Sequence, residues 1–507
     1  MAKTPSLSLR NLINALTGSE KRYFKLYVGE KIEKESKYLI LFDLIDQGII
    51  QDEDELKQAV YEGDIGESRK FSELKSYLFE LILRALQAYD TKGNVNIRLQ
   101  ELLQGTQVLF RRSLFKEAKQ NLGKAKKLAS KYEEHLLLLE IIRWEKKIAY
   151  ALTDIRFLDE ELENLEREER YHLAQYQLRT RYRNTFFKLL INIRKQGPGS
   201  GQGQHLQQLV TSIKRLVLPK ETGHNTKVIF YRLISMQKYI EGDIEGFIET
   251  NILLMKLLES EPHFLKQEVS EYISVVNNLL IGYGTLEKFD KVLMLLEKFK
   301  TIKAITTDDE LKIHRQYYMN LFAYYIHTGA FDDGIEAFKE HQKFIKKNKS
   351  QSFLKHSFYF QYFYLHFGAA QFDLALQYLN DWLDLKTNTE RHDLQALARI
   401  LNLLIHKEMG NTILIHSLTR SATRFLNKNN KPSKYEEAVL KYFRRSINSV
   451  DRSDEIRNLE TLLNDIRKIK SNRIDNNIMN LFDMESWVIS KLKNIPFMEL
   501  KKQQTKL

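Results

Sequence analysis

Basic side chains have the most suggestive spacing in this chain. Four lysines recur so that they fall within about 80° of one another on a helix turning 100° per residue. They are Lys116, Lys124, Lys127 and Lys131. A second group lies nearer the C-terminus and contains Arg420, Arg424, Arg444 and Arg445. Such groups neutralise phosphates or acidic side chains, so nucleic acid or an acidic partner is one interpretation. The other, which we favour, is a solvated face of a lysine-rich protein.

The residue types that carry catalysis or bind metals form no known motif. The 507 residues include no cysteine, which excludes disulfides, thiolate metal sites and cysteine nucleophiles. The 13 histidines include no His-Glu-x-x-His, and we interpret them as surface or hydrogen-bonded residues. Gly-x-Ser-x-Gly and protein-kinase signatures are also absent from the sequence. We therefore expect a protein that is not an enzyme and that holds no cofactor or metal.

A glycine-rich stretch, Gly-Pro-Gly-Ser-Gly-Gln-Gly, occupies residues 197–203. A phosphate-binding loop would need Gly-Lys-Ser/Thr at the start of the next helix. Gln204 and His205 stand there instead. We favour a flexible turn over a nucleotide site.

The net charge of +13 is unevenly distributed. Residues 99–196 hold 20 basic and 14 acidic groups, residues 401–507 hold 20 and 12, and residues 197–400 are neutral. No apolar run approaches the ~18 residues of a membrane helix, and the first residues lack the apolar core of a signal peptide. These features predict a cytoplasmic protein that does not insert into membranes.

Helices are predicted throughout, because apolar residues recur at i, i+3, i+4 and i+7 and no strand-length run alternates. Residues 159–195 form one long predicted helix that is acidic first and basic last, an order that complements the helix dipole. Eight aromatic residues from Phe353 to Phe367 crowd another helix. We favour a core position for them over an aromatic binding groove.

A spacing of large and small residues recurs along the chain. Its clearest copy is Tyr318-x2-Leu321-Phe322-x2-Tyr325-x3-Gly329-x-Phe331-x2-Gly334-x3-Phe338. Large residues at these positions face the partner helix of a hairpin, Gly329 permits a tight reversal, and Gly334 lets the helices approach closely. Other copies supply further packing positions, namely Ala118, Phe289, Phe372 and Ala375.

Seven anchor residues mark the copies of this pattern. They are Phe115, Ile155, Ile244, Phe289, Phe331, Phe372 and Thr412, separated by 40, 89, 45, 42, 41 and 40 residues. The interval of 89 is about two periods and predicts a further unit that turns near residue 200.

The pattern resembles that of tetratricopeptide repeats (TPR) over roughly residues 99–430, with a period of 40–45 in place of the usual ~34. The resemblance implies an all-α fold, an α-solenoid of antiparallel helix hairpins with helical caps. It also implies a protein or peptide partner bound on a concave surface.

Three regions are expected. Residues 1–98 form about five helices that either cap the array or dock a partner, or read DNA. Their net charge of −1 favours capping or docking over reading DNA. Residues 99–430 form the TPR-like array with its flexible turn at 197–203. Residues 431–507 form a C-terminal helical cap, with Trp487 packed beneath it, and a basic tail that frays from Lys501.

The function expected from this organisation is a non-enzymatic protein–protein interaction scaffold or adaptor. The alternative is a nucleic-acid-associated helical-repeat protein that uses the basic surfaces at 99–196 and 401–507.

Overall fold

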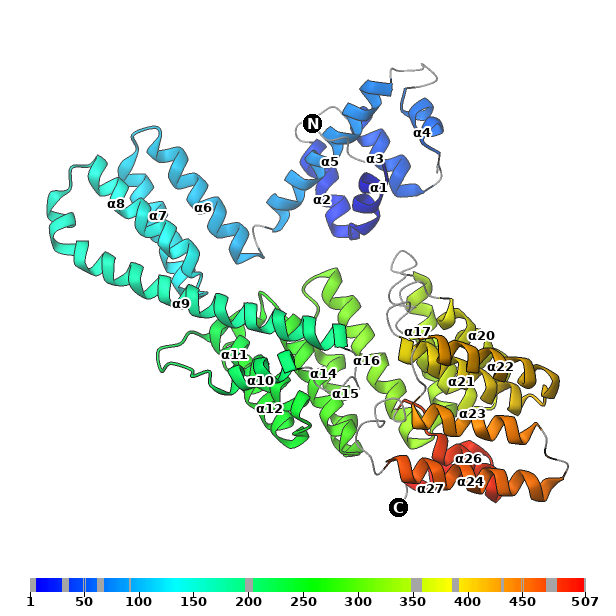
Figure 1. Cartoon of the computed structure of the whole chain (residues 1–507). Coiled ribbons are helices and arrows are strands. Elements are labelled where there is room, and N and C mark those ends of the chain that lie inside the picture. The colour runs from blue at the N-terminus through cyan, green and yellow to red at the C-terminus, as the bar shows by residue number, and fades with distance from the viewer. Residues whose placement is uncertain are drawn as a thin grey trace. The chain divides into compact units, whose positions relative to one another are not determined.

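The computed structural model describes residues 6–29, 36–48, 50, 52–61, 68–90, 93–196, 204–347, 358–384, 392–429, 433–447, 449, 451–470 and 481–505. All regular secondary structure in these ranges is α-helical and comprises 25 helices (Figure 1). The all-α prediction is therefore confirmed, while the solenoid arrangement stays a prediction. No helix in the same ranges combines the length and apolar character needed to cross a bilayer. The glycine-rich residues 197–203 and Phe353 lie outside the described residues.

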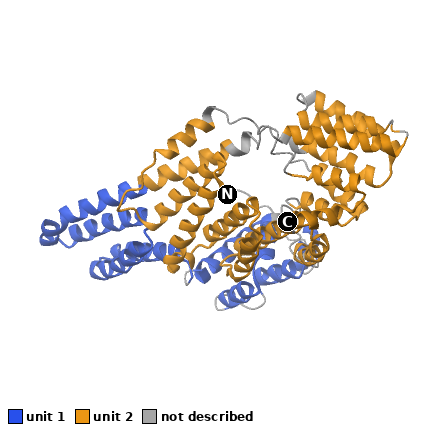
Figure 2. Ribbon diagram, turned by 90° about the horizontal axis from the view of Figure 1, so that it is seen from below, with its two compact units in different colours: residues 1–176 blue, residues 177–507 orange. Residues whose placement is uncertain are grey.

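The chain divides into two compact units, residues 1–176 and 177–507 (Figure 2). The division falls inside α9 (Ile155–Gln196), the long helix that the sequence predicted for residues 159–195. The boundaries expected after residues 98 and 430 stay predictions.

Unit 1 begins with five helices that enclose a core of their own. They are α1 (Ser6–Ala15), α2 (Gly18–Gly29), α3 (Lys37–Gln47), α4 (Glu53–Val60) and α5 (Ser68–Asp90). Phe24, Phe42 and Leu78 are fully buried in this core. At the start of α2, the Glu20 carboxylate accepts a 2.7 Å hydrogen bond from the amide of Thr17, whose hydroxyl accepts from the amide of Glu20 at 3.3 Å. This reciprocal cap satisfies two amides that the helix itself cannot pair.

The rest of unit 1 comprises α6 (Val95–Phe110), α7 (Phe115–Lys131), α8 (His135–Ala151) and the first part of α9. Ion pairs join α7 and α8 to the acidic start of α9. The Lys126 ammonium lies 3.0 Å from Glu145 and 2.9 Å from Glu168, and Lys146 lies 2.9 Å from Glu169. The acidic run of α9 therefore pairs with neighbouring helices in addition to complementing the dipole of its own helix.

Unit 2 contains the remainder of α9 and the helices that follow it. They are α10 (Gln204–Lys214), α11 (His224–Glu241), α12 (Ile244–Ser260), α13 (Pro262–Leu265), α14 (Ser270–Thr285), α15 (Phe289–Thr301), α16 (Thr307–Thr328), α17 (Phe331–Lys347), α19 (Tyr359–Gly368), α20 (Phe372–Leu383), α21 (His392–Glu408), α22 (Thr412–Asn429), α23 (Lys434–Ser446), α24 (Arg452–Lys470), α26 (Met484–Lys493) and α27 (Phe497–Thr505). Neighbouring helices pack in pairs along the chain, among them α11 with α12, α19 with α20 and α21 with α22.

One turn geometry recurs between paired helices. Its central residue is left-handed, the amide of that residue donates to the carbonyl three residues back, and the next amide donates to the carbonyl five residues back. These two bonds define the Schellman motif, which satisfies the last carbonyls of a helix. Both are present around Asn494, between α26 and α27, and around seven further residues, which are Ser113, Glu133, Thr153, Gly242, Glu287, Ala370 and Gly410.

The next helix begins two residues after each of these seven central residues. Gly329, with a φ of 72°, stands at the same position before α17. All seven anchor residues named from the sequence are consequently the first residues of helices, which are α7, α9, α12, α15, α17, α20 and α22.

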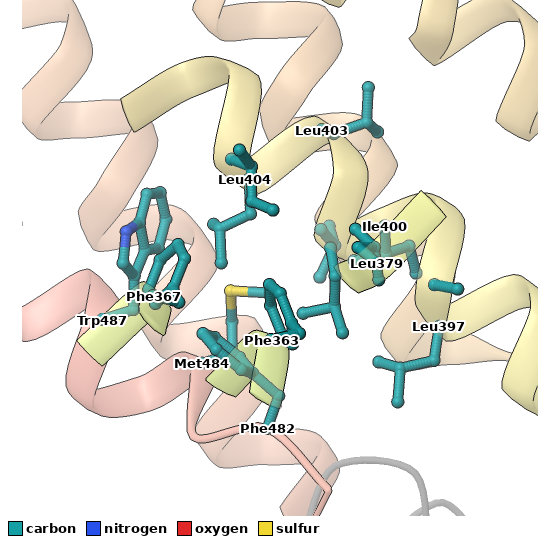
Figure 3. Packing of buried hydrophobic residues seen from close by; sticks show 14 of the residues in the cluster. Phe363, Phe367, Leu379, Leu397, Ile400, Leu403, Leu404, Phe482, Met484 and Trp487 are labelled. Atoms are coloured by element: carbon teal, nitrogen blue, oxygen red, sulfur yellow. The ribbon is translucent and has the colours of Figure 1, made fainter. Parts of the chain in front are cut away.

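The largest core in unit 2 is built around the aromatic helix α19. Phe358, Tyr362 and Phe363 are fully buried, so the core interpretation of this helix is confirmed. Figure 3 shows Phe363 and Phe367 beside Leu404, Phe482, Met484 and Trp487 in the same cluster. Trp487 is 1% exposed, as expected for a residue packed beneath the C-terminal helices.

The C-terminal residues are helical, so the prediction that the chain frays from Lys501 is wrong as far as Thr505. α27 packs against α16. The Phe497 ring stacks on Phe331, with 6.0 Å between centroids. The Lys501 ammonium lies 2.8 Å from Asp483, and its side chain is only 11% exposed. Aromatic burial and this ion pair hold the helix in place.

Replacing Gly329 with alanine should loosen α27. A Cβ at this position would lie 2.8 Å from the backbone nitrogen of Lys502, and φ there is +72°. Gly410 has the same φ, but a Cβ added there meets no atom within 4 Å. Gly410→Ala is therefore the control for the strain of about 1–2 kcal/mol that alanine carries in the left-handed conformation. We expect trypsin to cut after Lys501 and Lys502 several-fold faster in Gly329→Ala, measured by intact mass. Equal cleavage rates in the two variants would contradict this account of α27.

Candidate functional site

The packing positions named from the sequence lie at or near helix contacts. Ala118, Phe331 and Ala375 are fully buried. A Cβ at Gly334 would lie 3.3 Å from the Cβ of Tyr325 in α16 and 2.6 Å from Cδ2 of Leu365 in α19. The remaining positions are half-buried and comprise Phe289, Tyr325, Phe338 and Phe372.

The four lysines named from the sequence all lie on α7 in unit 1, and all are exposed. The Lys131 ammonium lies 5.7 Å from the centroid of the Tyr132 ring. Lys116, Lys124 and Lys127 make no ion pair or side-chain hydrogen bond with any residue that the structure describes. They form a basic face that is free to meet an anion.

The four arginines lie on α22 and α23 in unit 2. Arg420, Arg424 and Arg444 line one pocket of about 480 Å³, together with His416, Thr419, Thr423 and Ile447. We call it the arginine pocket. Arg445 is exposed and does not line it. The structure therefore brings three of the four arginines together.

A second pocket, of about 500 Å³, lies where α16 and α19 meet the C-terminal helices. We call it the interhelix pocket. Its wall on α16 and α19 includes Met319, Ala323, Ile326, Phe360, Gln361 and Tyr364, and its wall from the C-terminal part includes Tyr435, Ile466, Leu481, Asp483, Met484, Glu485 and Lys501. Glu287 and His327 complete it. The sequence pattern did not reveal this site, because its two walls lie far apart along the chain.

Two residues that line the interhelix pocket each carry a buried polar atom with no hydrogen-bond partner within the described protein. These atoms are the hydroxyl of Tyr435, a residue only 1% exposed, and the side-chain oxygen of Gln361. The amide nitrogen of Gln361 is used, since it donates to the carbonyl of Met319 at 2.8 Å. A buried polar atom without a partner costs about 1–3 kcal/mol. A bound group that formed a hydrogen bond with either atom would relieve this cost.

Charges in this pocket are largely paired. Burial alone would raise the pKa of the Asp483 carboxyl, but the Lys501 ammonium and hydrogen bonds from Ser486 hold it below its usual range. Burial also raises the pKa of the Tyr435 hydroxyl, and the nearby Asp483 carboxylate adds to the effect. Tyr435 therefore keeps its proton at neutral pH and can donate it in a hydrogen bond.

Two histidines and a tyrosine form a buried chain between α16, α17 and α19. Nε2 of His314 lies 2.8 Å from Nδ1 of His341, whose Nε2 lies 2.6 Å from the hydroxyl of Tyr362. Burial lowers the pKa of His314 to about 4. Burial, with a smaller effect of His314, lowers that of His341 to about 3. Both imidazoles are neutral and hydrogen-bonded, as the sequence interpretation of the histidines expected for these two.

Metal chemistry has no candidate site in the ranges given above, where no three His, Asp or Glu side chains gather in a way that could hold an ion. Comparison with protein-family models gave no match, and comparison with curated proteins gave none either. The two pockets and the basic face of α7 are therefore the surfaces on which a functional proposal can rest.

The buried histidine chain predicts a loss of stability in mild acid. Because burial lowers both folded-state pKa values, the unfolded chain binds more protons between about pH 6.5 and pH 4, and stability falls as the pH falls through this window. His341→Gln should shrink the difference in unfolding free energy between pH 7 and pH 5 by about 2 kcal/mol. Thermal unfolding of unit 2 at the two pH values measures it.

The control for this experiment is Phe299→Leu, a substitution at a fully buried residue of α15 that removes no titratable group. It should keep the wild-type difference between pH 7 and pH 5. An undiminished difference in His341→Gln would show that the buried chain does not cause the acid sensitivity.

Proposed function

We propose that this chain is a TPR-like α-solenoid that acts in the cytoplasm as a non-enzymatic scaffold for protein partners. Paired helices that follow one another along the chain support the arrangement, as do the left-handed turns that precede the second helix in most of these pairs. Contacts between first helices of successive pairs support it further, since α14 packs on α16, α16 on α19 and α21 on α23. The cysteine-free sequence agrees with a reducing compartment.

The interhelix pocket is the partner site in this proposal. The observation that carries it is the pair of buried atoms without partners, the Tyr435 hydroxyl and the Gln361 oxygen. Tyr435 can donate a hydrogen bond and the Gln361 oxygen can accept one. A peptide backbone offers one acceptor and one donor per residue, so an extended segment could satisfy both atoms.

Apolar residues beside these two atoms give the partner segment a further feature. Met319, Ala323 and Ile326 recur at i, i+4 and i+7 on α16 and line the pocket. Apolar area removed from water contributes about 25 cal/mol per Å². The expected ligand is therefore a peptide segment that places an apolar side chain against α16 while its backbone bonds to Gln361 and Tyr435.

Tyr435→Phe tests this proposal because stability and binding should move in opposite directions. Removing a buried hydroxyl that has no partner should leave the melting temperature of the free chain unchanged or raise it slightly. Recovery of the protein partner by affinity purification and mass spectrometry should fall about tenfold, the equivalent of about 1.4 kcal/mol. Nuclease treatment of the lysate should leave wild-type recovery unchanged.

Tyr442→Phe is the matched control, since that tyrosine is buried but its hydroxyl donates to Glu455 at 2.7 Å. It should lower the melting temperature and keep the partner. Equal partner recovery by Tyr435→Phe and wild type would contradict the pocket as the partner site, and loss of all partners on nuclease treatment would contradict the scaffold.

A second candidate function, association with nucleic acid, is favoured by the free lysines on α7. Lys-to-Gln substitution at all three should weaken binding of a short DNA duplex and reduce the magnitude of its log–log salt slope by up to about 2.7, or 0.9 per lost phosphate contact. The substituted residues are Lys116, Lys124 and Lys127. Binding is measured by fluorescence anisotropy between ~50 and ~200 mM salt.

The control triple neutralises exposed lysines that each already pair with a glutamate, namely Lys300, Lys339 and Lys343. It carries the same charge change and should leave the slope closer to wild type. No detectable binding of DNA or RNA at ~50 mM salt would exclude this second function.

A further inference from the structure

The arginine pocket gathers positive charge from two helices. His416, Arg420 and Arg424 recur every four residues and therefore share one face of α22. Arg444 reaches the same pocket from α23, and Ile447 follows on that side. Three arginines thus line a volume of about 480 Å³, which no acidic residue lines.

Hydrogen bonds orient the arginine from α23. Nη2 of Arg444 donates to the hydroxyl of Thr423 at 3.0 Å, and that hydroxyl donates to the carbonyl of Thr419 at 2.8 Å. The Thr419 hydroxyl in turn donates to the carbonyl of Ile415 at 2.6 Å. Both threonine protons are therefore committed to the backbone of α22, and the donors left for a ligand are the guanidinium N–H groups of Arg420 and Arg424.

Two of the three arginines in the pocket have no acidic partner among the described residues. Arg420 and Arg424 make no ion pair and no side-chain hydrogen bond with any part of the chain that the structure describes. Arginines on other exposed helices do pair, for example Arg69 with Glu73 and Arg156 with Glu160. α22 offers no such partner, since residues 412–429 contain no aspartate or glutamate. An anion in the pocket would relieve repulsion among the guanidinium groups.

Phosphate monoesters fit this donor set best. Guanidinium presents planar, forked N–H donors that bind phosphate oxygens in pairs, and a phosphorylated side chain carries about −1.5 to −2 charge at pH 7 with three acceptor oxygens. Three arginines exceed what one carboxylate can use. We propose that the arginine pocket binds a phosphorylated serine or threonine of a protein partner.

The pocket favours a phosphorylated side chain over nucleic acid. None of its seven lining residues is a Phe, Tyr or Trp on which a base could stack. The three arginines line a single hollow. Ile447 and the threonine methyl groups offer apolar contact to the carbon atoms of a phosphorylated side chain. This inference rests on the proposed scaffold function only in taking the phosphate from a protein.

Binding of degenerate peptide libraries to the purified full chain tests the inference. A fluorescent library centred on phosphoserine should bind saturably, and the same library with unmodified serine should bind at least tenfold more weakly. Arg420→Gln with Arg424→Gln should reduce the phosphoserine affinity at least tenfold. Inorganic phosphate should displace the library from the wild type.

Arg179→Gln with Arg183→Gln is the control, because these α9 arginines have the same i, i+4 spacing and the same charge change. It should leave phosphopeptide affinity within twofold of wild type. An equal loss in both double variants would mean that overall charge, not the pocket, attracts the peptide and would overturn the inference. Equal binding of the two libraries would also overturn it. So would single-stranded RNA that binds the wild type more tightly than the phosphoserine library does and whose binding is weakened only by the Arg420/Arg424 double substitution.

The two proposals fail separately. Phosphopeptide binding by the purified chain requires no partner from a lysate, so it can hold even if the interhelix pocket captures nothing. Conversely, a protein partner could be recovered after nuclease treatment and depend on Tyr435, yet bind equally well after phosphatase treatment and in the Arg420/Arg424 variant. That result would support the scaffold proposal and contradict the phosphate site.

Discussion

The left-handed residue between paired helices is the constraint on which the rest of the molecule depends. At eight turns its amide and the next one close the same two hydrogen bonds, so the chain reverses within a few residues. Only two of those eight central residues are glycine; the others are Ser113, Glu133, Thr153, Glu287, Ala370 and Asn494. An L-residue in this conformation carries about 1–2 kcal/mol of strain, which the packing of the paired helices must offset. The fold therefore balances local strain against burial at nearly every reversal.

Local features of this kind could be predicted from the sequence. The anchor residues Phe289, Phe331 and Phe372 each begin a helix, because turn and helix start are fixed by neighbours within a few positions. The aromatic crowding of α19 predicted burial for the same reason: period and residue type suffice. The Lys501 segment was mispredicted because its charge suggests a solvated tail, whereas a partner 18 residues away, Asp483, binds it.

The candidate sites depended on information that spacing does not contain. Tyr435 and Gln361 line one pocket although 74 residues separate them in the sequence. Residue type also does not distinguish a charged side chain that pairs with another from one that does not. The lysines of α7 include both, since Lys126 binds two glutamates while Lys127 beside it binds none. For Arg420 and Arg424 the decisive fact is the lack of acid on α22, which a count of basic residues over a long segment conceals.

The position of α27 has a consequence for the order in which unit 2 folds. Most helix contacts join neighbours in the chain, so helix pairs can form early and locally as the polypeptide grows. The hydroxyl of Thr505, by contrast, donates to the carbonyl of His327 across 178 residues. During synthesis, α16 can pack against α27 only after the whole intervening chain has left the ribosome. Docking of α27 is therefore a late step, and a nascent chain truncated before Phe497 leaves the turn at Gly329 uncovered.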